Sequence, residues 1–341
     1  MRFPNFIKDK DTICFVALSF GASTEPYLTR TKAAKNKFLK LGYNVIETKS
    51  TKEAVLPYLA NTPSVIAKEF MDAYLDKNTS LLISVGGGEM QCLTLPYLDF
   101  EALKKAPPKW VTGFSDNTNY SFLFPTILDV ATIYGACASS FGMRHWHASI
   151  EDEYALLKGT KTTVCGYPKY ELRPTAYQKK HPLGGYNLRW DKVITTFNYE
   201  KPFSGRLLGG CLDVLITLCG TKYDYVKEFN TRYQNDGVIW CLEACDLSPV
   251  AFYRALFQLR EAGWFATCRG FIIGRGLNTH QKEMFGIDEF TPLELLKDFN
   301  VPILANADLG HLKPSMPLVF GSYATVSYDG NIQIEMTFKE V

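Results

Sequence analysis

The chain has 341 residues, of which 46% are hydrophobic and 14% aromatic, which is enough to build two domains with sizeable cores. Its 37 basic and 35 acidic residues leave a net charge of +2, so no charge excess favours nucleic acid or an anionic membrane surface as a partner. Nine cysteines, an odd number scattered through apolar runs, predict buried free thiols in a reducing compartment rather than a disulfide framework.

Strand and helix signals alternate over the first third of the chain. The apolar run at 12–18 predicts a buried strand rather than a secretory signal, because Asp9 and Asp11 interrupt the basic region before it. Residues 124–143 are nearly free of charge, but Pro125 and Asp129 favour a buried helix and strand over a membrane span. The other predicted strands and helices are 28–41 (helix), 43–47 (strand), 64–75 (helix), 80–85 (strand), 110–114 (strand) and 117–128 (helix).

The pattern changes between 161 and 204, where proline and glycine crowd together and no period is sustained, as in a linker or an excursion that carries binding groups. We therefore predict an α/β protein. An N-terminal domain (1–164) has a parallel sheet with helices on both faces, and a linker and substrate-loop region (165–204) leads to a C-terminal mixed β/α domain (205–341). The elements expected after the linker are helices at 212–218 and 249–262 and strands at 238–242, 270–273, 301–305, 324–328 and 332–336, the last two joined by a turn at 329–330.

Ser115 stands between a predicted strand and a predicted helix, which is the geometry of a nucleophile elbow. The helix N-terminus behind it offers N–H groups to a developing oxyanion. Asn117 occupies the place of the second glycine in the usual G-x-S-x-G pattern. Taken alone, this segment is better explained by Ser115 or Asp116 acting as a simple helix cap than by a nucleophile.

Three further segments carry groups suited to the same chemistry. Gly86–Gly88 follow a strand and could expose backbone N–H groups at its carboxyl end, or could simply form a tight turn. Glu243 ends an apolar strand, where a carboxylate needs a partner, unless it lies exposed just past the strand. His311 follows a buried strand and is a candidate base, unless it is an ordinary surface histidine.

A metal site is the weaker alternative. His145 and His147 would share one face of a strand, with Glu151 and Asp152 nearby, but no third ligand stands at a familiar spacing. The spacing of Cys241 and Cys245 suits neither a zinc knuckle nor a redox pair.

Together these segments resemble the serine peptidases that comprise the LD-carboxypeptidases and the microcin C immunity peptidases. The likeness is carried by ordered motifs over nearly the whole chain. They are the opening strand Phe15-Val-Ala-Leu-Ser, the Gly86–Gly88 turn, Gly113-Phe-Ser-Asp-Asn-Thr, Gly205-Arg-Leu-Leu-Gly-Gly-Cys-Leu, Leu242-Glu243, and Gly310-His311 with Pro314 after it.

The resemblance implies a Ser-Glu-His triad in that chain order, with Ser115 as nucleophile, His311 as general base and acid, and Glu243 as the group that orients His311. It implies an oxyanion hole made of the backbone N–H of Asp116 and one from Gly87 or Gly88. It further implies a site at the junction of two domains, a cytoplasmic homodimer, and no metal or other cofactor.

Cys211 departs from the resemblance, because the family often has asparagine at this position near the substrate. The length of the chain and the irregular 161–204 stretch are closer to the microcin-immunity branch. In that branch a loop from this region supplies aromatic residues that hold a nucleotide-like ligand, and Trp190 and Tyr186 could do so here by stacking. For Trp190, ordinary packing is an equally good explanation.

The leading functional prediction is an amide hydrolase acting on a murein peptide or an aminoacyl-nucleotide-like toxin, with no nucleic acid and no membrane as partner. One alternative is a catalytically silent two-domain peptide-binding protein that retains the triad residues. The other is a metal-dependent hydrolase built on His145 and His147.

Overall fold

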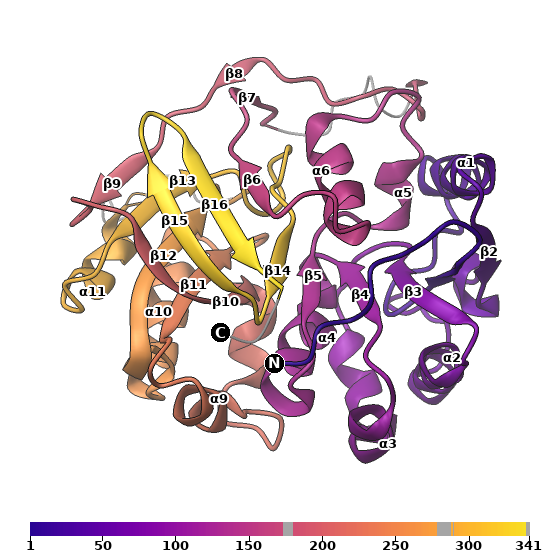
Figure 1. The fold of residues 1–341 in the computed structure, drawn as a ribbon, viewed down its shortest axis with the longest axis horizontal. Helices are drawn as coiled ribbons and strands as arrows, with labels where there is room; N and C mark the ends of the chain where they lie inside the picture. The colour runs from indigo at the N-terminus through magenta and orange to yellow at the C-terminus, as the bar shows by residue number, and fades with distance from the viewer. Residues whose placement is uncertain (173–179, 278–287, 289, 339–341) are drawn as a thin grey trace.

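The computed structural model describes residues 1–172, 180–277, 288 and 290–338, which form two large sheets (Figure 1). The first sheet has six strands in the order β14-β5-β4-β3-β1-β2. Its five N-terminal strands are parallel, and β14 pairs antiparallel with β5 at one edge. The strands are β1 (Thr12–Val16), β2 (Asn44–Glu47), β3 (Thr79–Ser84), β4 (Trp110–Gly113), β5 (Thr132–Tyr134) and β14 (Leu318–Phe320).

Helices cover both faces of this sheet, as predicted (Figure 1). On one face Phe38, Phe141 and Tyr154 belong to one aromatic cluster, and on the other Phe70 packs against Tyr120. Each cluster ties together helices that are far apart in the sequence, so both faces are closed by aromatic packing. The helices are α1 (Tyr27–Lys40), α2 (Pro63–Leu75), α3 (Phe100–Lys105), α4 (Thr118–Leu123), α5 (Ala138–Phe141) and α6 (Ala148–Leu157).

The single helix predicted at 117–128 is wrong in detail. A 3₁₀ turn at Ser115–Asn117 precedes α4, and a wider π turn at Phe124–Leu128 follows it. Pro125 lies in that last turn, and because proline has no backbone N–H it cannot continue the α-helical hydrogen bonding. The charge-free stretch thus becomes short turns and the buried strand β5. Across the described part of the chain, no helix has the length and apolar character needed to cross a membrane.

The second sheet has eight strands in the order β6-β16-β15-β10-β11-β12-β13-β9. Four central strands are parallel, and antiparallel strands flank them on both sides, which is the predicted mixed architecture. The strands are β6 (Thr163–Cys165), β9 (Thr195–Phe197), β10 (Phe203–Cys211), β11 (Val238–Glu243), β12 (Cys268–Gly274), β13 (Ile303–Ala307), β15 (Tyr323–Tyr328) and β16 (Ile332–Thr337). Its helices are α8 (Leu212–Leu218), α9 (Val226–Arg232), α10 (Pro249–Glu261) and α11 (Glu294–Lys297).

The two sheets exchange strands. β14 comes from the C-terminal part of the chain but completes the first sheet, whereas β6 comes from 163–165 and joins the second. The boundaries predicted from the sequence, with one domain ending at 164 and the other beginning at 205, therefore stay a prediction. The Thr118 hydroxyl at the start of α4 accepts a hydrogen bond from the Cys211 N–H at the end of β10 (3.0 Å), so the carboxyl ends of β4 and β10 lie together.

Candidate active site

Ser115 lies on a tight turn after β4. Its φ of +66° is a backbone conformation that residues other than glycine rarely adopt. Asn117 stabilises this turn, because its Nδ2 donates to the carbonyl oxygens of Phe114 (2.8 Å) and Gly86 (3.0 Å). The asparagine that replaces the usual glycine therefore ties the Ser115 turn to the glycine turn after β3. A side chain at Gly113 would meet the Asn117 amide at 2.8 Å, which explains glycine there.

Ser115, His311 and Glu243 are brought together from three distant segments. The Ser115 Oγ lies 2.9 Å from His311 Nε2, and His311 Nδ1 lies 2.8 Å from Glu243 Oε2. The Glu243 side chain is fully buried, while the imidazole is 13% exposed. The three residues thus form a continuous chain of hydrogen bonds that reaches from the interior to the surface of the site.

Glu243 determines which nitrogen of His311 carries the proton. Burial alone would raise the pKa of its carboxyl, but the charge and hydrogen bond of His311 and the Tyr134 hydroxyl outweigh burial and hold the pKa below its usual value. An ionised carboxylate only accepts hydrogen bonds, so Nδ1 donates to Glu243 and the Nε2 lone pair faces the Ser115 hydroxyl. This arrangement can remove the serine proton.

Gly310 allows the His311 loop to approach Glu243. Its φ is +101°, and a side chain there would overlap the Glu243 carboxylate. Glycine is therefore required at this position both for the backbone conformation and for the close contact.

Of the three glycines after β3, Gly87 is the one that lies against Ser115. A Cβ built on Gly87 would sit 3.1 Å from the Ser115 Oγ, whereas one built on Gly88 would overlap the Ser19 hydroxyl. Asp116, the residue after Ser115, is buried, and its Oδ2 accepts from the Gln91 N–H at 2.9 Å. Of these residues, Gly87 is therefore the one that the structure places against the serine hydroxyl.

Tyr134 links the serine to the glutamate and was missed by the sequence analysis. Its hydroxyl accepts from the Ser115 N–H (3.2 Å) and donates to Glu243 Oε1 (2.5 Å), while its ring stacks on Phe320 of β14. No sequence motif is associated with a tyrosine at the end of a short buried strand. The position of Tyr134 becomes clear only in the structure, where β5 pairs with β14.

Glu153 is another buried carboxyl, located behind the serine turn. It accepts from the Thr112 hydroxyl (2.6 Å) and the Ala136 N–H (2.5 Å), and burial raises its pKa to about 7. Because this pKa exceeds the unfolded value, the folded state binds more protons, and stability is lost as pH rises from about 4.5 to 7. The loss corresponds to about 3 kcal/mol at full ionisation.

We therefore expect the melting temperature of the wild type to fall relative to that of Glu153→Gln as the pH is raised from about 5 to about 8. Glutamine keeps the shape and cannot ionise. Thermal unfolding of both proteins at each pH measures the difference, with Glu335→Gln, an exposed glutamate on β16, as the control. Parallel pH profiles for the wild type and Glu153→Gln would show that Glu153 does not titrate in this way.

The three residues proposed from the sequence to contact substrate lie in different surroundings. Cys211 is buried close to Glu243 and His311, and its Sγ donates to Asp213 Oδ2 at 3.2 Å. Trp190 is 52% exposed on β8 (Trp190–Asp191), which pairs with β7 (Lys169–Tyr170). Tyr186 packs its ring against His147 at 5.3 Å.

The alternative metal site at His145 and His147 receives no support from the structure. His147 Nδ1 accepts from the Ser149 N–H and so caps α6. In the described residues, the group of at least three ligand-type side chains that could hold an ion is instead Cys211, Glu243 and His311.

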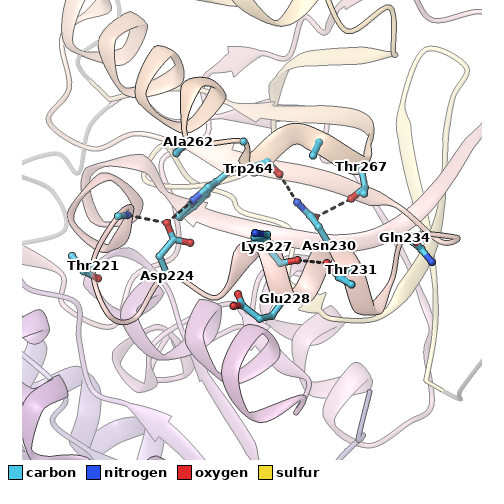
Figure 2. Close-up of a pocket in the computed structure, with 13 residues that line it drawn as sticks. Thr221, Asp224, Lys227, Glu228, Asn230, Thr231, Gln234, Ala262, Trp264 and Thr267 are labelled. Carbon is cyan, nitrogen blue, oxygen red and sulfur yellow. Dashed lines mark hydrogen bonds between the residues drawn. The ribbon is translucent and has the colours of Figure 1, made fainter.

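A separate hollow of about 570 Å³ lies between α9 and the segment 262–267 (Figure 2). Its polar side chains bond to one another: Asp224 accepts from the Trp264 indole, and Asn230 bonds to Trp264 O and Thr267. Its lining includes none of Ser115, Glu243 and His311.

Comparison with known families assigns the chain to a family. The family model of the LD-carboxypeptidase N-terminal domain matches residues 13–135, and that of the LD-carboxypeptidase C-terminal domain matches residues 204–326. The chain belongs to the LD-carboxypeptidase family.

Its relatives include microcin immunity proteins. It is 24% identical to the microcin C7 self-immunity protein MccF of Escherichia coli over 335 residues, which covers 93% of this chain and 92% of that protein. The structure of an MccF-like protein from Bacillus anthracis matches with a TM-score of 0.81 at 21% identity, covering 99% and 100% of the two chains. MccF in complex with aspartyl sulfamoyl adenosine matches with a TM-score of 0.79 at 21% identity, covering 99% of each chain.

Proposed function

We propose that this protein is a serine peptidase that hydrolyses an amide bond with Ser115, His311 and Glu243. The observation that carries the proposal is the pair of hydrogen bonds joining these side chains, 2.9 Å and 2.8 Å long. His311 takes the Ser115 proton as Oγ attacks the carbonyl carbon, and later returns it to the leaving nitrogen. Glu243 keeps the imidazole in the tautomer that can accept that proton and stabilises the imidazolium that forms.

The tetrahedral oxygen would be held by the backbone N–H groups of Asp116 and Gly87. This choice favours Gly87 over Gly88, because Gly87 is the glycine that lies against the Ser115 hydroxyl. Donors fixed in place before the reaction stabilise the oxyanion without reorganising during it.

Gly87→Ala tests this placement. The added methyl would lie about 3.1 Å from the Ser115 Oγ, so we expect it to displace the hydroxyl or the substrate carbonyl. We expect kcat to fall about 100-fold or more, the scale seen when one oxyanion donor is lost. Steady-state kinetics against Gly185→Ala, where a Cβ meets nothing within 4 Å, provides the comparison. Equal kcat values in Gly87→Ala and Gly185→Ala would show that Gly87 does not contribute to the oxyanion hole.

Tyr134→Phe tests the link between serine and glutamate. The phenylalanine keeps the stacked ring but removes the hydrogen bond to the Glu243 carboxylate, and bonds to charged groups contribute about 1.5–3 kcal/mol. We expect kcat to fall about 10- to 100-fold with little change in KM. Tyr120→Phe is the matched control, because the Tyr120 hydroxyl is also buried but bonds to Thr94 instead. An unchanged kcat in Tyr134→Phe would exclude a positioning role.

For the substrate, we favour an aminoacyl-nucleotide-like compound over a murein peptide. Trp190 offers an exposed aromatic face, and base stacking on such a face is tolerant of the base. The β7–β8 ribbon that carries Trp190 is fixed near the triad, because the Glu171 N–H donates to the carbonyl of Lys313, two residues after His311, at 2.9 Å. Relatives of this fold bind aspartyl sulfamoyl adenosine and glutamyl sulfamoyl guanosine.

A substrate panel tests the proposal directly. Purified protein is incubated with a murein tetrapeptide, aspartyl sulfamoyl adenosine and glutamyl sulfamoyl adenosine, and the products are identified by mass spectrometry. We expect the sulfamoyl compounds to lose their amino acid, and Trp190→Ala to raise KM for them. Cleavage of the murein peptide alone would assign the other substrate class, and binding without cleavage of any compound would favour a silent binding protein.

We also propose a cytoplasmic homodimer. The nine cysteines, all free, support a reducing compartment. Sedimentation analysis of the purified chain tests the oligomeric state, and a single monomer-sized species at micromolar concentration would contradict it.

A further inference from the structure

Cys211 lies directly beside the proposed catalytic residues. It ends β10 in register with Glu243 of β11, so the two side chains start from neighbouring positions at one end of the sheet. The Cys211 sulfur, one Glu243 oxygen and one His311 nitrogen all lie within 4.8 Å of one another. A cysteine sulfur that gives up its proton on binding, a carboxylate and an imidazole form a donor set that borderline-soft divalent cations prefer.

Asp213 holds the Cys211 thiol in the metal-free protein. Its Oδ2 accepts from the Cys211 thiol (3.2 Å) and from the Cys245 N–H (3.0 Å), and its Oδ1 accepts from the Asp246 N–H (2.9 Å). The two backbone N–H groups keep the carboxylate in place, and its hydrogen bond from the thiol is lost when the sulfur binds a cation. The carboxylate also adds negative charge beside Glu243, which favours a cation at this point.

We propose that Cys211, Glu243 and His311 bind a thiophilic divalent cation such as Zn²⁺, and that this ion inhibits the enzyme. On binding, sulfur, oxygen and nitrogen each donate a lone pair to the ion, and the thiol proton passes to water; no group is oxidised or reduced. If the ion binds Nδ1, His311 loses its hydrogen bond with Glu243. If the ion binds Nε2, His311 loses its hydrogen bond with Ser115. Both outcomes interrupt proton transfer from the serine.

The binding part of this inference does not depend on the proposed hydrolysis, whereas the inhibition does. Cd²⁺ titration therefore comes first, because the sulfur-to-cadmium charge-transfer absorption reports a metal–thiolate bond without any substrate. We expect the wild type to show one more tight cadmium–thiolate equivalent than Cys211→Ser. Cys165→Ser, which changes a partly buried cysteine on the edge strand β6, should match the wild type.

His311→Asn provides a second variant at a partly exposed position, in case Cys211→Ser folds poorly, and should weaken the tight cadmium equivalent at least tenfold. Zn²⁺ should also inhibit hydrolysis of the panel substrate, reversibly with a chelator, and less in Cys211→Ser when each rate is divided by the metal-free rate of the same variant. Equal cadmium titrations for the wild type, Cys211→Ser and His311→Asn would overturn the proposal. Binding without inhibition would overturn its regulatory part, and binding in a protein that hydrolyses nothing would count against the proposed function alone.

Discussion

Ser115→Ala should abolish turnover, with a fall in kcat of about a million-fold, the scale measured when a serine nucleophile is removed from a triad. The fold should survive, because alanine and serine tolerate the positive φ at this turn about equally and the hydroxyl bonds only to His311 among the contacts described. The measurement is single-turnover hydrolysis of the best panel substrate, with the melting temperature as a check on folding.

Ser121→Ala is the matched control for the nucleophile. Ser121 lies in the adjacent helix α4, and its buried hydroxyl finds no hydrogen-bond partner among the residues that the structure describes, so its loss should leave kcat within about twofold. A Ser115→Ala variant that keeps more than about a tenth of the wild-type kcat would disprove the assignment, because that loss is smaller than 1.4 kcal/mol.

Glu243→Gln should lower kcat by about 10⁴-fold with a much smaller change in KM. The glutamate accepts from both His311 and Tyr134, whereas glutamine has one acceptor oxygen and one donor group. If the amide oxygen faces Tyr134, its NH₂ faces Nδ1 and leaves the proton on Nε2, where it blocks transfer from serine. If the amide is turned round, the Tyr134 hydroxyl loses its acceptor.

The double variant Ser115→Ala/Glu243→Gln should be no slower than Ser115→Ala, because both residues act in one unit. Asp246→Asn, which changes an exposed carboxylate three residues after Glu243 in the sequence, should keep most of the activity. Losses that simply add in the double variant would place Glu243 outside the triad, and a large loss in Asp246→Asn would then identify Asp246 as the orienting group.

Much of the fold could be predicted because its central strands are buried on both faces. Such strands appear in the sequence as continuous apolar runs, for example 13–16 and 238–242, and the turns after them are marked by Gly86–Gly88 and by Gly310. The candidate residues could be singled out one by one for the same reason, because Ser115, Glu243 and His311 each follow or end such a strand. Their grouping into one site came from the resemblance to the LD-carboxypeptidases, because the serine belongs to one sheet and the other two residues to the second.

The remaining features depend on pairing between distant segments. Strands of two or three residues, such as β7, β8 and β14, are too short to show a period, so neither the position of Trp190 nor the stacking of Tyr134 on Phe320 could be predicted. The helix expected at 117–128 was broken by Pro125 and by the tight turn that presents Ser115. The closeness of Cys211 to His311 arises only when β10, β11 and the loop after β13 are brought together.

The strand exchange at β14 has a mechanical consequence. The serine belongs to the first sheet, and the glutamate and histidine belong to the second. Yet β14 (Leu318–Phe320), which begins only seven residues after His311, pairs with β5 of the first sheet. A separation of the two sheets at the candidate site would therefore act directly on the β14–β5 pairing and on the stacking of Phe320 against Tyr134. We expect these contacts to resist such a movement and to keep Ser115 in position relative to Glu243 and His311 when a ligand binds.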